Sequence, residues 1–329
     1  PEMDIEKISL QYEILPISNR FKDGILLRNY EKENYRSFPL FLGRGCSRKC
    51  AFCDYNQFKF RVRQISQILK EIDYLMRKYN AKYFSFANPS FCENKKFVKE
   101  FCEVLIDMYP NIKWSCEARV DTPIELLELM AKAGCISIAF GLESGSEKVL
   151  KAINKNIDLT KTFEFAKACH SLNIRSHMFL MVSLPEETKD DALQTINVCR
   201  ELSKYVTNIS LAVTQILPGT KLESIAFEKG VLPADFSYYD ERFYHLNTQF
   251  NEAHIPLYIE HLNIDFIEEF FIMIMDLKAQ KYENINVLMN KAKHGLLSLH
   301  KRSFKKNLIY IRRFVIAVLK KIQLRIVRV

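Results

Sequence analysis

Three of the nine cysteines stand within eight positions in the segment GRGCSRKCAFCDY, residues 43–55. Cys46, Cys50 and Cys53 have the spacing C-x3-C-x2-C, so three thiolates of one loop can converge on a single metal centre. A structural zinc site normally has four closed ligands, and the next cysteine is Cys92. An iron–sulfur cluster tolerates three protein thiolates and leaves one iron open for an outside ligand. The spacing favours such a cluster, with structural zinc or an accidental group of buried cysteines as alternatives.

The neighbouring residues suit a metal-binding loop. Gly43 and Gly45 would let the backbone turn sharply beneath the metal centre. Arg44, Arg48 and Lys49 supply local positive charge, from which we predict a lowered thiol pKa and a larger thiolate fraction.

The cysteine segment directly follows the first of six apolar segments that alternate with helical patterns. The apolar segments predict strands over 38–43, 82–88, 112–120, 135–143, 174–184 and 208–220. Apolar residues at helical spacing predict helices over 65–79, 93–109, 123–133, 146–172 with a break near 154–158, and 188–205. Such alternation implies parallel strands joined by right-handed crossovers. Ligand sites gather at the carboxyl ends of such strands, where the cysteines lie.

The predicted fold class is therefore α/β, a partial (β/α)6 barrel of parallel strands followed by a helical C-terminal region. A doubly wound sheet fits the same alternation, and the near-continuous apolar strands suit a sheet covered on both faces. We expect three parts: a lead-in over 1–37, a core over 38–228 and a helical region over 229–329, which includes a helix over 264–282.

The net charge of +9 comes from the end of the chain. Residues 301–329 hold ten Lys and Arg side chains and no Asp or Glu, and their apolar residues recur at helical spacing. This pattern predicts a basic amphipathic helix. Three roles stay open for it: packing on the body of the protein, peripheral contact with an anionic membrane surface, and, less favoured, binding of nucleic-acid phosphates.

The remaining six cysteines occur singly, unlike those of a secreted disulfide scaffold. We therefore predict a cytoplasmic protein, with contact at the inner membrane surface as an option for the tail. The first residues, PEMDIEKISL, have neither the apolar core of a signal peptide nor an initiator Met, so we expect an excerpt of a longer protein. No apolar run approaches the roughly 18 residues that a membrane span needs.

Several segments carry a resemblance to a known family. CSRKCAFC, residues 46–53, resembles the cluster loop of the radical S-adenosylmethionine (SAM) enzymes, including the aromatic Phe52 before the last cysteine. EARVDTPIELLELMAKAGCISIAFGLESGSEKVLKAINK, residues 117–155, is similar to the matching region of the cobalamin-binding subfamily and of the methylthiotransferases. FLMVSLPEET (179–188) and LPGTKLESIAFEKG (217–230) resemble the ends of strands five and six in that group.

The resemblance implies a [4Fe–4S] cluster held by the three cysteines, whose open iron chelates the amino and carboxylate groups of SAM. Reductive cleavage of SAM would release a 5′-deoxyadenosyl radical that abstracts hydrogen from a substrate. An electron donor such as a flavodoxin or ferredoxin is implied as well. Reactions of the subfamily, including methylation at unactivated carbon and ring rearrangement, imply a small-molecule or lipid substrate. Cobalamin would be a cofactor only if an upstream domain supplies it.

Polar residues at strand ends are the candidate SAM contacts. Glu117 and Arg119 are two apart on a strand and point to one face, where they could simply form an ion pair. The resemblance places Arg119 near the SAM carboxylate, and Glu117 near the ribose or the ammonium group. It places Glu143 near the ribose hydroxyls or the ammonium group. The full set of implied cofactor-binding residues is Phe52, Asn88, Glu117, Arg119, Glu143, Ser144, Ser183 and Leu217.

Two strand ends depart from the pattern of the subfamily. Acidic residues usually end strand two in the subfamily, but this chain has Asn88 and Pro89 there. The amide oxygen of Asn88 can accept a hydrogen bond from the SAM ammonium group, but it carries no charge. Ser183 and Glu186 replace two glycines that would let the backbone approach the adenosine closely. These departures indicate either drift within the family or an altered or lost activity.

Two other functions fit parts of the sequence. A tRNA-modifying methylthiotransferase resembles this chain in the core but carries a C-terminal β-barrel for RNA, and no strand-rich segment follows residue 230. A non-catalytic module could bind zinc through the cysteines and nucleic acid through the basic tail. Such a module would not need the GLESGS segment at 141–146.

Overall fold

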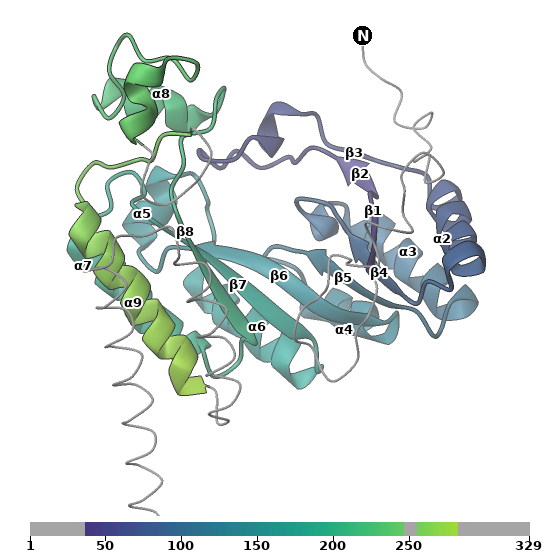
Figure 1. The fold of residues 1–329 in the computed structure, drawn as a ribbon. Helices are drawn as coiled ribbons and strands as arrows, with labels where there is room; N and C mark the ends of the chain where they lie inside the picture. The colour runs from purple at the N-terminus through teal and green to yellow at the C-terminus, as the bar shows by residue number, and fades with distance from the viewer. Residues whose placement is uncertain (1–36, 247–254, 282–329) are drawn as a thin grey trace, which may run out of the picture.

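Six parallel strands form the central sheet of the computed structural model, which describes residues 37–246 and 255–281 (Figure 1). The strands are β1 (Ser37–Leu40), β4 (Tyr83–Phe86), β5 (Lys113–Glu117), β6 (Cys135–Glu143), β7 (Arg175–Val182) and β8 (Asn208–Val213). They lie in chain order, and every neighbouring pair is parallel. A doubly wound sheet would reverse this order at an inner strand. The sequential order therefore confirms the predicted partial (β/α)6 barrel.

Helices follow the strands and most of them cover one face of the sheet (Figure 1). They are α2 (Ile65–Tyr79), α3 (Lys95–Met108), α4 (Ile124–Lys132), α5 (Glu147–Ala152), α6 (Leu159–Ser171) and α7 (Lys189–Leu202), with short 3-10 helices η2 (Tyr55–Gln57) and η3 (Phe91–Glu93). The stretch predicted over 146–172 is thus two helices, separated where a break was predicted. Beyond β8 lie α8 (Lys221–Glu228), η4 (Glu241–Leu246) and α9 (Ile264–Lys281), and α9 packs beside α7 and β8.

Parts of the predicted organisation lie outside the described residues. These are the lead-in up to residue 36 and the basic amphipathic helix over 301–329. In the two described ranges, no helix combines the length and the apolar character that crossing a membrane requires.

The two faces of the sheet differ in burial. Phe84 and Phe86 of β4 and Trp114 of β5 are buried against the helices, whereas the residues between them are only half-buried. β7 alternates in the same way along its whole length. The helices therefore cover an outer face, and the opposite, inner face is less covered. The sequence favoured a sheet covered on both faces, and among the described residues the inner face is half-buried.

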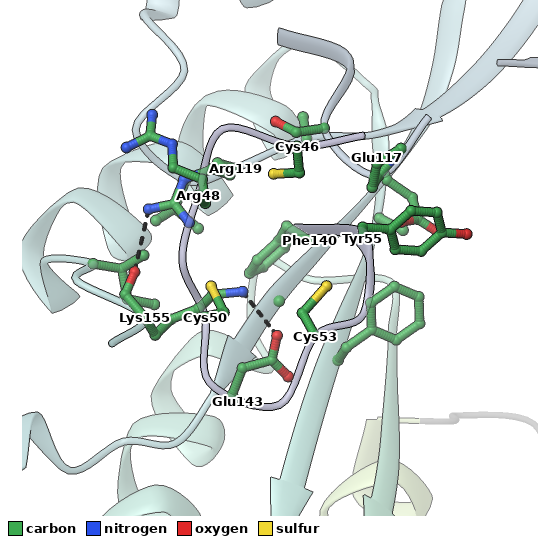
Figure 2. A pocket seen from close by; sticks show the side chains of 18 of the residues that line it. Cys46, Arg48, Cys50, Cys53, Tyr55, Glu117, Arg119, Phe140, Glu143 and Lys155 are labelled. Atoms are coloured by element: carbon green, nitrogen blue, oxygen red, sulfur yellow. Dashed lines mark hydrogen bonds and ion pairs between the residues drawn. The ribbon is translucent and has the colours of Figure 1, made fainter. Parts of the chain in front are cut away.

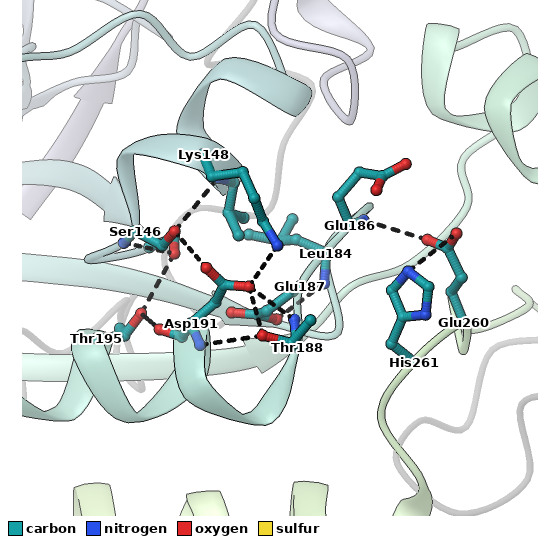
Figure 3. A network of polar contacts seen from close by, with 12 residues as sticks. Ser146, Lys148, Leu184, Glu186, Glu187, Thr188, Asp191, Thr195, Glu260 and His261 are labelled. Carbon is teal, nitrogen blue, oxygen red and sulfur yellow. Dashed lines mark hydrogen bonds and ion pairs between the residues drawn. The ribbon is translucent and has the colours of Figure 1, made fainter.

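A buried polar network joins α5 to α7 and fixes the end of β6 (Figure 3). Ser146 caps α5 by accepting a hydrogen bond from the Val149 amide, and its hydroxyl donates to Asp191 Oδ1 at 2.7 Å. Asp191 forms a capping box with Thr188 at the start of α7 and an ion pair with Lys148 at 2.7 Å. Burial alone would raise the pKa of Asp191, but the hydrogen bonds from these partners together hold it well below its usual value. The β6–α5 turn is thereby anchored to the neighbouring helix.

Glu187, in the turn between β7 and α7, is almost fully buried. Its Oε2 accepts a hydrogen bond from the Leu184 amide at 3.0 Å, and its Oε1 has no partner among the described residues. Burial raises the pKa of this carboxyl to about 7, although backbone hydrogen bonds act in the opposite direction. An unfolded glutamate ionises at about pH 4.3, so the folded protein keeps a proton that the unfolded chain releases.

We predict that Glu187→Gln loses a pH dependence of stability. Because the folded pKa lies above the unfolded one, the free energy of unfolding of the wild type falls as pH rises from about 4.3 to about 7. In the variant this fall is smaller by roughly 3 kcal/mol. Urea unfolding at several pH values across this window measures it, with Glu201→Gln at an exposed position of α7 as the matched control. An identical pH dependence in wild type and Glu187→Gln would contradict the assigned pKa.

Candidate functional site

The three thiols of the cysteine segment face one cavity of about 220 Å³ at the carboxyl ends of the strands (Figure 2). Cys50 is buried, Cys46 and Cys53 are half-buried, and none is in a disulfide. The remaining wall of the cavity comes from β5, β6, β7 and the segments that follow them, and includes Glu117, Arg119, Glu143, Lys155 and Phe179.

A short antiparallel pair closes the base of the cysteine loop. β2 (Gly43–Arg44) pairs with β3 (Arg61–Val62). A Cβ atom at Gly43 would lie 2.2 Å from a carbonyl oxygen of β3. Gly45 has a φ of +76°, and its Cβ would lie 2.4 Å from the Phe58 carbonyl oxygen. Both positions require glycine, because a side chain at either would force the two ends of the loop apart.

The turn after α5 holds the middle of the cysteine loop. The Ile153 carbonyl accepts a hydrogen bond from the Ala51 amide at 2.8 Å. The Asn154 side chain donates to the Lys49 carbonyl, also at 2.8 Å. On the other side, the Leu222 amide at the start of α8 donates to the Ala51 carbonyl at 2.8 Å. The positions of the cysteines are thus set by elements more than 90 residues away in the chain.

The charges around the loop do not act on the thiols as the sequence predicted. Burial raises the pKa of Cys46 and of Cys53 above the ordinary thiol value. Arg48 is engaged by carboxylates of two neighbouring segments, at 3.4 and 3.3 Å, and Arg44 lies over an aromatic ring at 4.2 Å. The prediction of a lowered pKa is therefore wrong for Cys46 and Cys53, and a bound cation would have to supply the shift at these two thiols.

Glu143 ends β6 in a left-handed backbone conformation, with a φ of +64°, at an irregularity in the pairing with β7. Its carboxylate forms a buried ion pair with Lys155 at 2.8 Å. Gly141 leaves the room for this pair, since a Cβ there would lie 1.9 Å from Glu143 Oε1. A non-glycine residue in this conformation costs about 1–3 kcal/mol, and such strain clusters at functional sites. Among the residues of the wall, Glu143 is therefore the one whose backbone conformation most strongly indicates a functional role.

Glu117 and Arg119 both line the cavity, but no ion pair joins them in the described structure. Arg119 instead pairs with Asp121 at 3.2 Å and donates to the Lys155 carbonyl at 3.3 Å. Partial desolvation, and after it the negative charge of Glu143, raise the pKa of Glu117. The Glu117 carboxylate stays accessible from the cavity, and so offers an acceptor to a ligand.

Two further predicted contacts come from the cysteine loop and from the end of β4. Phe52 lines the cavity. Asn88 is buried beside it and is not part of the lining, because its Oδ1 accepts a hydrogen bond from the Leu42 amide at 2.9 Å. Its neighbour Pro89 lines the cavity in its place.

The other three predicted contacts lie outside the cavity lining. Ser144 is fully buried, and its hydroxyl lies 3.2 Å from that of Thr195 in α7. Ser183 is buried with a φ of +64°. The carbonyl of Leu217 accepts a hydrogen bond from the Thr220 hydroxyl at 2.7 Å. These residues support the walls without facing the cavity.

The sequence did not indicate the wall residues Tyr55, Ser90 and Lys155. Tyr55 lies two residues after Cys53, and this proximity was the signal that could have found it. Lys155 offers no local signal, since it reaches the cavity only because the turn after α5 folds back beneath the cysteine loop.

The donor set suits a cluster better than a single metal ion. Within the described ranges, no three Cys, His, Asp or Glu side chains are grouped closely enough to hold one ion together. The cysteines of a four-iron cluster bind separate irons and so stand around it. Three thiols around one cavity, with carboxylates and cations on the facing wall, fit a cluster with an outside ligand (Figure 2).

Comparison with known families agrees with this geometry. Residues 40–199 match the family model described as the Radical SAM superfamily, from the end of β1 into α7. The core of the chain, residues 40–199, belongs to the radical SAM superfamily. This confirms the resemblance that the cysteine loop and the GLESGS segment carried.

Relatives of this radical SAM chain include enzymes of several kinds. An uncharacterized methyltransferase from Pyrococcus horikoshii is 24% identical over 225 residues, which are 67% of this chain and 46% of the relative. The anaerobic magnesium-protoporphyrin IX monomethyl ester cyclase of Cereibacter sphaeroides is 28% identical over 178 residues, 52% of this chain and 29% of the cyclase. The chain thus spans less than half the length of either relative.

A solved structure shows the same fold. The cobalamin-dependent S-adenosylmethionine radical enzyme OxsB, with aqua-cobalamin and S-adenosylmethionine bound, superimposes with a TM-score of 0.57. The superposition covers 86% of this radical SAM chain and 46% of OxsB, at 17% sequence identity. At this identity the likeness is one of fold.

We predict that Gly45→Ala prevents assembly of a cluster. The added methyl group would collide with the Phe58 and Lys59 carbonyl oxygens and open the cysteine loop. Gly230→Ala is the matched control, because Gly230 has a similar φ of +67° but no atom within 4 Å of its Cβ position. Iron and sulfide per chain after anaerobic reconstitution are the measurement. A full iron content in Gly45→Ala would show that the close approach at this glycine is not needed.

Proposed function

We propose that the chain binds a [4Fe–4S] cluster through Cys46, Cys50 and Cys53 and cleaves SAM reductively to start radical chemistry on a substrate. The observation that carries this proposal is the shared cavity, in which the three thiols face Glu117, Glu143 and other polar side chains (Figure 2). The three cysteines would hold a cluster that supplies the electron for reductive cleavage of SAM to methionine and a 5′-deoxyadenosyl radical.

The wall residues of this chain would bind and orient the SAM molecule. The accessible carboxylate of Glu117 can accept hydrogen bonds from the ammonium group or the ribose hydroxyls. Glu143 can do the same from its strained position, while Lys155 holds it in place at 2.8 Å. Arg119 supplies a cation for the methionine carboxylate. Phe52 adds an apolar surface beside the loop that limits the access of water.

The reaction we favour is methylation or a related carbon-centred reaction on a small molecule or a lipid. The relatives named as a methyltransferase and a cyclase support this class. A flavodoxin or ferredoxin would supply the electron, in the cytoplasm or at the inner membrane surface. Cobalamin, which is bound in OxsB, would take part only if a domain outside this chain holds it. A methylthiotransferase acting on tRNA is less supported, because the described chain after β8 is mainly helical.

Anaerobic reconstitution tests the proposal. We expect a brown protein with about four irons per chain, which on reduction converts SAM to 5′-deoxyadenosine and methionine. Cys50→Ala should abolish the cleavage, whereas Cys199→Ala, at a buried cysteine of α7, should retain it. A colourless protein that binds zinc and shifts RNA in a gel would overturn the proposal in favour of a non-catalytic module.

We also predict that Glu143→Gln weakens SAM binding roughly tenfold, since a charge-assisted hydrogen bond contributes about 1.5 kcal/mol or more. The variant keeps the shape of the side chain but removes its charge and its ion pair with Lys155. Equilibrium dialysis of SAM against cluster-loaded protein measures the affinity. Glu147→Gln, at an exposed position of α5, is the control. Equal affinity in Glu143→Gln, at equal iron content, would exclude Glu143 as a SAM contact.

A further inference from the structure

A second cavity, of about 490 Å³, opens at the amino ends of the strands, at the opposite end of the sheet from the cysteine loop. Its lining includes Tyr83 at the start of β4, Lys113 at the start of β5 and Arg175 at the start of β7. His170 and Tyr205 complete it from the helical side, with their rings in edge contact at 6.1 Å.

Both cavities include side chains from the inner face of the sheet. Lys113 precedes the buried Trp114, so the alternation of a strand places Lys113 on the inner face. Glu117 lies four residues further along β5 and therefore on the same face. Arg175 and Phe179 stand in the same relation on β7. Glu117 and Phe179 line the cysteine cavity, so the same face of β5 and β7 contributes residues to both sites.

The charged side chains found in the lining of the second cavity are basic. Among the residues that the structure describes, the lining holds Lys113, Arg175 and His170 and no carboxylate. None of the ion pairs found among the described residues involves Lys113, although it is half-buried. A partly desolvated ammonium group without a counter-ion is unfavourable, and an anionic ligand would remove that penalty. Tyr83, the direct cross-strand neighbour of Lys113, adds an aromatic ring.

The surface between the cavities is made of small or polar side chains. Ser115, Ser137 and Ala139 come from β5 and β6, and His177 comes from β7, where its ring lies 2.7 Å from the Ser210 hydroxyl. Four residues along a strand span about 13 Å. An elongated molecule can therefore lie along this face with its two ends in the two cavities.

We propose that the second cavity binds the acidic group, a carboxylate or a phosphate, of an elongated substrate whose reacting carbon lies at the cysteine cavity. This inference rests on the proposed radical SAM function for the reaction, but the anion site itself needs neither the cluster nor SAM. Lys113 is then a specificity-determining residue, because its ammonium group would select acidic over neutral molecules.

Fluorine NMR of the protein without a cluster tests the site. The probes are 4-fluorophenyl phosphate, 4-fluorobenzoate and the neutral 4-fluorobenzyl alcohol. We expect at least one anionic probe to bind, the alcohol to bind more than tenfold more weakly, and Lys113→Met to weaken the anion roughly tenfold. The ratio between phosphate and benzoate identifies the acidic group. Lys161→Met, at an exposed position of α6, should leave binding unchanged.

The outcomes separate this inference from the proposed function. Equal binding of the neutral and the anionic probes, no binding of either anion, or full affinity in Lys113→Met would each overturn the anion site, whatever SAM cleavage shows. Binding that depends on Lys113 in a protein that fails to cleave SAM would keep the site and remove the proposed reaction.

Discussion

The site depends on one turn, residues 153–156, which touches both the cysteine loop and the facing wall. Its backbone and the Asn154 side chain fix the loop at Ala51 and Lys49. Lys155 then pairs with Glu143 through its ammonium group and accepts a hydrogen bond from Arg119 through its carbonyl. Since the same four residues position thiols, carboxylate and guanidinium, this turn would set the distance between a cluster at the thiols and a ligand at the facing wall. A shift of this turn would move both partners together.

The turn is itself held in place by buried polar contacts rather than by apolar packing alone. α5 is only six residues long, too short to be stable by itself. Its start is tied to α7 by the pair of Ser146 and Asp191 at 2.7 Å, and Gly145 lies so close to Thr195 that a Cβ would be 2.7 Å from its Cα. The second glycine of GLESGS therefore serves helix packing, while its first serves the ion pair of Glu143. The two glycines of GLESGS thus allow close contacts on the two sides of the end of β6.

Much of the fold and of the site could be predicted from the sequence, because the features that indicate them are local patterns of residues. Strands and helices follow from apolar periodicity, and strands joined by helices leave few topologies. The cysteines, Glu117, Arg119 and Glu143 were found because they lie at or just after the ends of strands, where parallel sheets gather ligands, and because the family resemblance marks the same positions. Asn88 and Ser144 show the limit of that rule, since a residue at a strand end can also point sideways into a hydrogen bond. Lys155 shows the other limit, because no local pattern reports a long-range fold-back.

The departures at the end of β7 leave the cavity intact. Ser183 and Glu186 have φ values of +64° and +63°, the left-handed conformation that glycine adopts without cost. The chain therefore follows the path that glycines would favour, and the difference lies in the side chains. Glu186 is not part of the cavity lining, and its carboxylate pairs with Lys229 at 2.5 Å. Its amide donates to Glu260 at 3.2 Å (Figure 3). These contacts offset part of the conformational cost. Glu186 therefore links the turn after β7 to the end of α8, and its side chain does not occupy the cavity.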